Sequence, residues 1–315
     1  MATVLVVIDN PGAALHKSHR ELLTLAGTFG DAVVAFIGDL PDAIAQELGA
    51  RGVRTVYRPA AADVEEFLVA GKAGFLTAVV RSSSPAAVLL GNTFEAKEIA
   101  ARAGIQLSSG VITDAVAIGE DLTVTKSVLA GSYAVEAKVT TGTPLITVKA
   151  NIVDVAAAGE GDLPELVTVE SVTPANTARI TGRTAKPASG RPELTEARVI
   201  VAGGRGVDGD FSPVEELADA LGGAVGASRA ATDAGWIEHS AQIGQTGKTV
   251  SPQLYISAGI SGAIQQKAGM QTAKVIIAVN KDSDSPVFDI ADFGIVGDLF
   301  TVLPQATAEI IKRRS

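Results

Sequence analysis

Two parts of this 315-residue chain alternate short apolar runs with segments of helical periodicity, and this alternation constrains the fold more than any other feature. In the first hundred residues the apolar runs have the length and continuity of buried parallel strands, and helical patterns lie between them. The apolar runs are 4–8, 32–37, 53–57 and 86–90, and the helical patterns are 16–28, 41–48, 63–79 and 93–103. Such alternation predicts a parallel sheet covered by helices on both faces.

The middle of the chain changes character. Residues 122–129, 132–139 and 144–150 are rich in β-formers and are joined by glycine turns, which predicts an antiparallel addition to the first sheet. A proline-rich stretch follows, and residues around 186–192 have the composition of a linker. We therefore predict an N-terminal domain of residues 1–190 and a C-terminal domain of residues 191–315.

The second domain repeats the alternation. Its expected strands are 198–202, 224–227, 254–258, 274–279 and 300–303, and its expected helices are 213–221, a helix from about 263, and 307–312. This order predicts a second, Rossmann-like α/β domain.

Composition excludes several classes of function. The formal net charge is −9, so the basic surface that nucleic acid requires is missing. The chain has no cysteine, which excludes disulfides, thiolate metal sites and a cysteine nucleophile. No apolar run approaches the roughly 20 residues of a membrane helix, and no signal peptide precedes the first expected strand. We expect a soluble, cytoplasmic protein.

The glycine-rich turns of the second domain form the candidate site. Residues 203–206, Ser228, residues 259–262 and Asn280 each follow an expected strand. Ligands of open α/β sheets bind outside the carboxyl ends of the strands, where these segments meet. Their backbone N–H groups and hydroxyls suit a phosphate. Arg205 is either a surface arginine or a partner of a pyrophosphate.

Better-known motifs fit poorly. Residues 244–249 resemble a P-loop, but Gln242 stands where that motif needs glycine. Residues 259–263 resemble a nucleophile elbow that ends in alanine, so we expect Ser261 to cap a helix beside an anion-binding turn instead. His16 and His19 have the spacing of one helix face, and we expect a solvated surface pair and no metal site.

Four segments resemble electron transfer flavoprotein alpha subunits, in the same order. They are VAGGRG (201–206), VGASRAATDAG (225–235), QIGQTGKTVSPQLY (242–255) and the run LYISAGISGAIQQKAGMQTAKVIIAVNKDSDSPVFDIADFGIVGDLFTVLP (254–304). The resemblance extends over essentially the whole chain and is densest after Arg198.

The resemblance implies an electron carrier without substrate turnover of its own. In this family the alpha subunit forms a heterodimer with a beta subunit. FAD is held mainly by the C-terminal domain of alpha, and AMP by the beta subunit. The heterodimer accepts electrons from acyl-CoA dehydrogenases of fatty acid β-oxidation and other flavin dehydrogenases. It passes them to a membrane quinone oxidoreductase of the respiratory chain.

The resemblance also implies a role for individual residues. Arg205 is expected near the FAD phosphates, Ser228 and Arg229 at the flavin, and the Thr246 hydroxyl at flavin N5. The other expected FAD contacts are Ile243, Gly244 and Gln245 along the flavin ring, Ser261, Gly262, Ala263, Ile264 and Gln265 near the pyrophosphate and ribityl chain, and Asn280, Asp298 and Leu299 around the adenosine.

Gln266 departs from the family pattern. Many members have histidine there, near the pyrimidine edge of the flavin, where a protonated imidazole favours an anionic reduced flavin. Glutamine donates a hydrogen bond but carries no titratable charge. We therefore regard Arg229, Thr246 and Gln266 as the residues that tune the redox potential.

Two other classes of function remain as alternatives. An NAD-dependent two-domain oxidoreductase needs an acidic residue after the second strand, where Ser228 and Arg229 stand instead. A non-redox nucleotide-binding subunit would bind AMP or ATP but no flavin. The sequence leaves open the donor dehydrogenase and whether the complex is a bifurcating one, with a second FAD in the beta subunit.

Overall fold

The computed structural model describes residues 2–9, 11–60, 62–129, 131–170, 177–184 and 190–314. The chain forms two compact units. The first contains Met1–Lys126 and Val135–Ala185, and the second contains Ser127–Ala134 and Lys186–Ser315. Part of the predicted linker lies outside the described residues, so the domain bounds 1–190 and 191–315 stay a prediction. Among the described residues, no helix is both long and apolar enough to cross a bilayer.

In the first unit the described strands form one sheet in the order β7-β6-β5-β8-β4-β1-β2-β3-β9. The strands are β1 (Thr3–Ile8), β2 (Asp31–Phe36), β3 (Thr55–Pro59), β4 (Ala87–Gly91), β5 (Val111–Ile118), β6 (Val124–Val128), β7 (Tyr133–Ala137), β8 (Leu145–Val148) and β9 (Glu165–Val169). The helices are α1 (Lys17–Phe29), α2 (Asp42–Ala50), the 3₁₀ turn η1 (Ala62–Phe67), α3 (Leu68–Ser83) and α4 (Phe94–Leu107).

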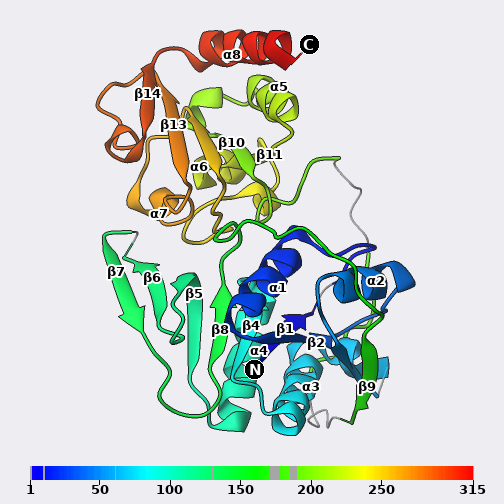
Figure 1. The fold of residues 1–315 in the computed structure, drawn as a ribbon. Helices are drawn as coiled ribbons and strands as arrows, with labels where there is room; N and C mark the ends of the chain where they lie inside the picture. The colour runs from blue at the N-terminus through cyan, green and yellow to red at the C-terminus, as the bar shows by residue number, and fades with distance from the viewer. Residues whose placement is uncertain are drawn as a thin grey trace. The chain divides into compact units, whose positions relative to one another are not determined.

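Alternate residues of β1 enter different cores. Val4, Val6 and Ile8 pack with α1 and α2, whereas Leu5 and Val7 pack with α3 and α4. Helices therefore cover both faces of the sheet (Figure 1). This explains why the parallel strands are continuous apolar runs rather than alternating ones, and it confirms the predicted α/β architecture.

The antiparallel addition is smaller than predicted. β5 and β6 pair antiparallel, but β8 lies between β4 and β5 and is parallel to both. The prediction that residues 144–150 belong to the antiparallel part was wrong. All four residues of β8 are buried, as in a strand covered on both faces, and the preceding glycine turn does not form a hairpin with its predicted neighbour.

In the second unit the described strands form a parallel sheet in the order β11-β10-β12-β13-β14. These strands are β10 (Val199–Gly203), β11 (Ala224–Ala227), β12 (Leu254–Ala258), β13 (Val275–Asn280) and β14 (Phe293–Val296). The helices are α5 (Ser212–Leu221), α6 (Arg229–Asp233), α7 (Ile264–Lys267) and α8 (Leu299–Arg314), with 3₁₀ turns η2 (Arg205–Val207), η3 (His239–Ala241) and η4 (Phe288–Ile290). α5 and α8 lie side by side on one face of this sheet (Figure 1).

The fifth strand was predicted in the wrong place. Residues 300–303 belong to α8, and β14 lies earlier. The Asp298 carboxylate accepts a hydrogen bond from the Phe300 N–H at 3.0 Å and so begins the helix. Leu299, Leu303 and Thr307 are then buried at a spacing of four residues, which is the helical period.

The turns after β10 and β12 pack backbone against backbone. The Gly204 N–H donates to the Ala258 carbonyl and the Gly206 N–H to the Gly259 carbonyl, both at 2.9 Å. Gly204 has a φ of −112°, which alanine adopts easily, but a Cβ there would lie 2.4 Å from the Gly259 oxygen. Glycine is therefore required at 204 by the close approach and not by backbone conformation.

Gly204→Ala should lower the free energy of unfolding by about 1–3 kcal/mol, because one added methyl group forces the two turns apart. Gly27→Ala is the matched control. Gly27 lies in α1 and a Cβ there meets nothing within 4 Å, so alanine should stabilise the protein by about 0.5–1 kcal/mol. Urea denaturation of both variants measures the difference. Equal stability of Gly204→Ala and the unmodified protein would contradict the packing argument.

Candidate functional site

A cavity of about 1020 Å³ lies at the carboxyl ends of the strands of the second unit. Numbered within this sheet, the strand order is 2-1-3-4-5, so the chain reverses its direction of winding between β10 and β12. Ligands of doubly wound sheets bind at such a switch point. Gly203 and Ala258 are paired in register at the ends of these strands, so the two turns begin side by side.

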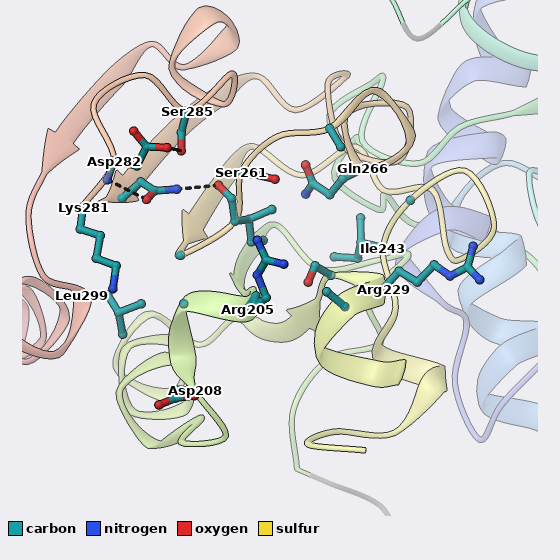
Figure 2. Close-up of a pocket in the computed structure, with 18 of the residues that line it drawn as sticks. Arg205, Asp208, Arg229, Ile243, Ser261, Gln266, Lys281, Asp282, Ser285 and Leu299 are labelled. Atoms are coloured by element: carbon teal, nitrogen blue, oxygen red, sulfur yellow. Dashed lines mark hydrogen bonds between the residues drawn. The ribbon is translucent and has the colours of Figure 1, made fainter. Parts of the chain in front are cut away.

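The cavity has two ends and a middle. Its volume is at the upper limit of ordinary ligand pockets and suits a long cofactor better than a small metabolite. Figure 2 shows Ile243, Gln266 and Arg229 at one end, Arg205 and Ser261 in the middle, and Lys281, Asp282 and Leu299 at the other end.

Two arginines line the cavity, and they differ in charge compensation. The Arg229 side chain is 70% exposed, and its Nε lies 3.1 Å from the Asp233 carboxylate one helical turn away. Arg205 makes no ion pair with any of the residues that the structure describes. Its guanidinium extends into the middle of the cavity (Figure 2). Arg205 therefore has its full charge and all its donors available for an anion such as a pyrophosphate.

The segment 242–248 is a closed loop and not a P-loop. The Lys248 N–H donates to the Gln242 carbonyl at 2.8 Å, and the Gly244 N–H donates to the Lys248 carbonyl at 3.2 Å. The Gln245 N–H donates to the Gln265 carbonyl at 2.7 Å and ties the loop to α7. Gln245 and Thr246 are exposed at its tip and line the cavity. The loop presents polar groups to a ligand from a fixed backbone.

Gln266 contributes an unpartnered polar atom. Its side chain is only 8% exposed, and Nε2 donates to the Tyr255 hydroxyl at 2.9 Å. Its Oε1 is buried and has no hydrogen-bond partner in the described structure. Tyr255 is fully buried, and burial raises the pKa of its hydroxyl, which therefore stays protonated. Since an unpaired buried oxygen is costly, this wall of the cavity is suited to an N–H donor of a ligand.

The opposite end is closed by α8 and the loop after β13. Asn280 Nδ2 donates to the Ile260 carbonyl at 3.1 Å, which connects the loops after β12 and β13. Asp298 already occupies the N-terminus of α8 with its carboxylate. The Asp298 carboxylate disfavours a phosphate at this helix N-terminus, and Lys281 and Asp282 bring opposite charges to the same end, so this end suits a part of a ligand without net charge.

Most of the predicted cofactor contacts line this cavity. They are Arg205, Ser228, Arg229, Ile243, Gly244, Gln245, Thr246, Ser261, Ala263, Gln265, Gln266, Asn280, Asp298 and Leu299. Gly262 and Ile264 do not line it. Gly262 has a φ of +82°, and a Cβ there would lie 2.5 Å from the Val287 backbone, whereas Ile264 is 69% exposed. The binding roles of all these residues stay predictions.

Sequence reasoning missed part of the lining. Gly206, Gly259 and Ile260 belong to the two predicted glycine turns, and the additional lining residues are Asp208, Ala230, Gln242, Lys281, Asp282, Ser285, Gly297 and Phe300. Most follow a strand end by a few residues, so extending each predicted turn would have included them. Gln242 had been considered only as a mismatch to a P-loop.

Two other expectations were wrong. Ser261 does not cap α7, whose N-cap is Ala263 without a side-chain hydrogen bond, because α7 begins later and has only four residues. His19 is not solvated, since α1 packs on the sheet and leaves it 6% exposed, with its ring against that of His16. Among the described residues, no cluster of three or more His, Asp or Glu side chains has the geometry for a metal ion.

Each of the two units matches a domain of the electron transfer flavoproteins. Residues 4–174 match the electron transfer flavoprotein domain, and residues 193–271 match the electron transfer flavoprotein FAD-binding domain. The second match contains the turns after β10 and β12 and the loop 242–248, which surround the cavity.

Whole-length relatives have the same description. The chain is 46% identical over 320 residues to electron transfer flavoprotein subunit alpha of Mycobacterium leprae, with all of both chains covered. It is 48% identical to that of Mycobacterium tuberculosis, covering 100% of this chain and 99% of the relative, and 37% identical to that of Paracoccus denitrificans, covering 98% and 100%. With both units matched and the relatives covered from end to end, the chain belongs to the electron transfer flavoprotein alpha-subunit family.

Proposed function

We propose that the chain is the FAD-binding subunit of a heterodimeric electron carrier. The carrier accepts electrons from acyl-CoA dehydrogenases and other flavin dehydrogenases and passes them to a quinone oxidoreductase of the respiratory chain. The observation that carries this proposal is the cavity at the switch point of the second unit, within the region matched by the FAD-binding domain.

The cavity residues fit FAD in their chemistry and in their order. The unpaired Arg205 lies in the middle, where the pyrophosphate of an extended FAD would lie. Gln266, with its unpartnered Oε1, lies toward one end, and the imide edge of a flavin offers the N–H donor that this oxygen lacks. We assign the flavin to this end and the adenosine to the end with Asn280 and Asp298.

The bound FAD supplies the redox chemistry, and the chain supplies binding, orientation and electrostatics. Ser228 and Arg229 present a hydroxyl and a cation at the flavin end, and Thr246 presents a hydroxyl for N5. Of the acids that line the cavity, Asp208 and Asp282 lie toward the other half, and Asp298 directly precedes Leu299 at that end. This distribution supports a carrier that tunes a flavin and performs no substrate turnover of its own.

Co-expression with a beta subunit tests the proposed function. We expect a purified heterodimer with flavin absorbance that releases one FAD and one AMP on extraction. Two FAD per heterodimer would instead identify a bifurcating carrier and contradict the assignment of AMP. A complex that contains NAD, AMP or ATP but no flavin would refute the proposal.

Arg229→Ala should lower the reduction potential of the first electron by roughly 20–50 mV, because an exposed positive charge near the flavin is lost. Asp233→Asn is the matched control. It leaves the arginine but removes its countercharge, so the potential should stay the same or rise. Spectroelectrochemical titration of the heterodimer measures both variants. An unchanged or higher potential for Arg229→Ala argues against a tuning role.

Gln266→His should make the flavin potential depend more steeply on pH between about 6 and 8. An imidazole that gains a proton stabilises the anionic reduced flavin. As the pH falls, the potential of the variant should therefore rise more than that of the unmodified protein. Gln266 has no titratable proton in this range. Redox titrations of the two proteins at several pH values test this, and identical pH dependence would refute it.

A further inference from the structure

The direction of the Thr246 hydroxyl hydrogen depends on what its oxygen accepts. A hydroxyl has one hydrogen to donate and lone pairs to accept. Gln242 Nε2 donates to Thr246 Oγ1 at 3.0 Å. Because the Gln242 amide donates to the Thr246 oxygen from within the loop, the Thr246 hydroxyl hydrogen points away from Gln242. Thr246 is at the exposed tip of the loop and lines the cavity.

The side-chain amide of Gln242 is buried and has a hydrogen-bond partner at both its oxygen and its nitrogen. Its side chain is 7% exposed, and its Oε1 lies 3.1 Å from Thr232 Oγ1, whose single hydrogen is shared with the Arg229 carbonyl at 3.0 Å. Thr232 is itself 2% exposed and is fixed on α6. With Oε1 toward Thr232, Nε2 is turned toward Thr246. The two threonines and the amide form a chain of hydrogen bonds that runs from the interior to the loop tip.

The backbone around this chain is equally constrained. Gln242 donates its own N–H to the His239 carbonyl at 3.0 Å and accepts from Lys248 at its carbonyl. A Cβ at Gly247 would lie 2.4 Å from the Gln242 oxygen, so the two arms of the loop are in close contact. The side chains of Gln242 and Thr246 therefore meet across a loop that has little freedom to separate them.

We infer that Gln242 is a positioning residue that directs the Thr246 hydroxyl hydrogen into the cavity, toward an acceptor nitrogen of the flavin. The inference rests on the proposed function. It assigns to a largely buried glutamine of the cavity wall a role that acts through Thr246. Without Gln242 the hydroxyl is free to donate to other acceptors, and the hydrogen bond to the flavin loses its preorganisation.

Gln242→Glu is the sharpest variant because it has the same shape and replaces the donor by an acceptor. A carboxylate at 242 draws the Thr246 hydrogen away from the cavity. Measured at pH 8, where the carboxyl group is ionised more fully, FAD should dissociate from the apo-heterodimer about fivefold more readily, which corresponds to one neutral hydrogen bond. Thr246→Val should show the same loss, and the double variant should show no further loss.

The comparison ligand is 5-deaza-FAD, in which a C–H group replaces the acceptor nitrogen. All variants should bind this analogue as tightly as the unmodified protein does. Fluorescence titration of the apo-heterodimer with each ligand gives the dissociation constants. Additive losses in the double variant, or a loss of 5-deaza-FAD binding in Gln242→Glu, would overturn the inference and show that Gln242 serves only the loop structure.

A second variant covers the case in which Gln242→Glu does not fold. Methionine in Gln242→Met fills the same space but offers the Thr246 hydroxyl neither an N–H donor nor a carbonyl acceptor. This variant should therefore reduce the preference for FAD over 5-deaza-FAD, but by less than the fivefold change expected for Gln242→Glu. Full preference in this variant would overturn the inference. Failure of the proposed function is distinguishable, because the unmodified heterodimer would then bind neither flavin. Binding of FAD with no effect of Thr246→Val would overturn only the inference.

Discussion

The backbone hydrogen bonds between the turns after β10 and β12 are the interaction on which the rest of the site depends. They join the two strands at which the sheet reverses its winding, and they require glycine because the chains approach too closely for a Cβ. Arg205 lies between the two hydrogen-bonded glycines of one turn and Ser261 lies in the other, so the same contact fixes the middle of the cavity. The loop 242–248 and α8 then close the two ends around it.

The charged groups of the cavity are distributed unevenly along its length. Arg205 is central, Lys281 lies with the carboxylates toward one end, and the other end has neutral amides and hydroxyls with a partly compensated arginine. Neutral hydrogen bonds and one exposed charge shift a flavin potential modestly and without proton exchange. The unpartnered Gln266 amide oxygen is costly in the free chain, and we propose that an N–H group of the flavin pairs with it.

The sequence predicted the site better than it predicted several of the elements around it. Four separated segments, two of them glycine turns, were expected at one edge because the carboxyl ends of parallel strands necessarily meet there. The prediction of a strand at 300–303 was wrong, because a short apolar run does not distinguish a strand from the buried stripe of a helix. The Asp298 carboxylate caps a helix that begins there instead. The antiparallel placement predicted for β8 was wrong, because a local turn signal cannot indicate which distant strand becomes the neighbour. Tertiary packing brings together the side chains that form two further hydrogen bonds, Gln242 with Thr232 and Gln266 with Tyr255. These residues are ten and eleven positions apart, so no local sequence pattern predicts the bonds.

We propose that FAD lies in this cavity, with its flavin beside Thr246 and Gln266 and its pyrophosphate beside Arg205. A crystal structure of the flavin-loaded heterodimer tests it most directly. We expect flavin density at the end lined by Ile243 and Gln266, an N–H of the pyrimidine ring within hydrogen-bond distance of the Gln266 amide, and the phosphates at the Arg205 guanidinium. Flavin density outside this cavity, or in the reverse orientation with the adenine beside Gln266, would contradict it.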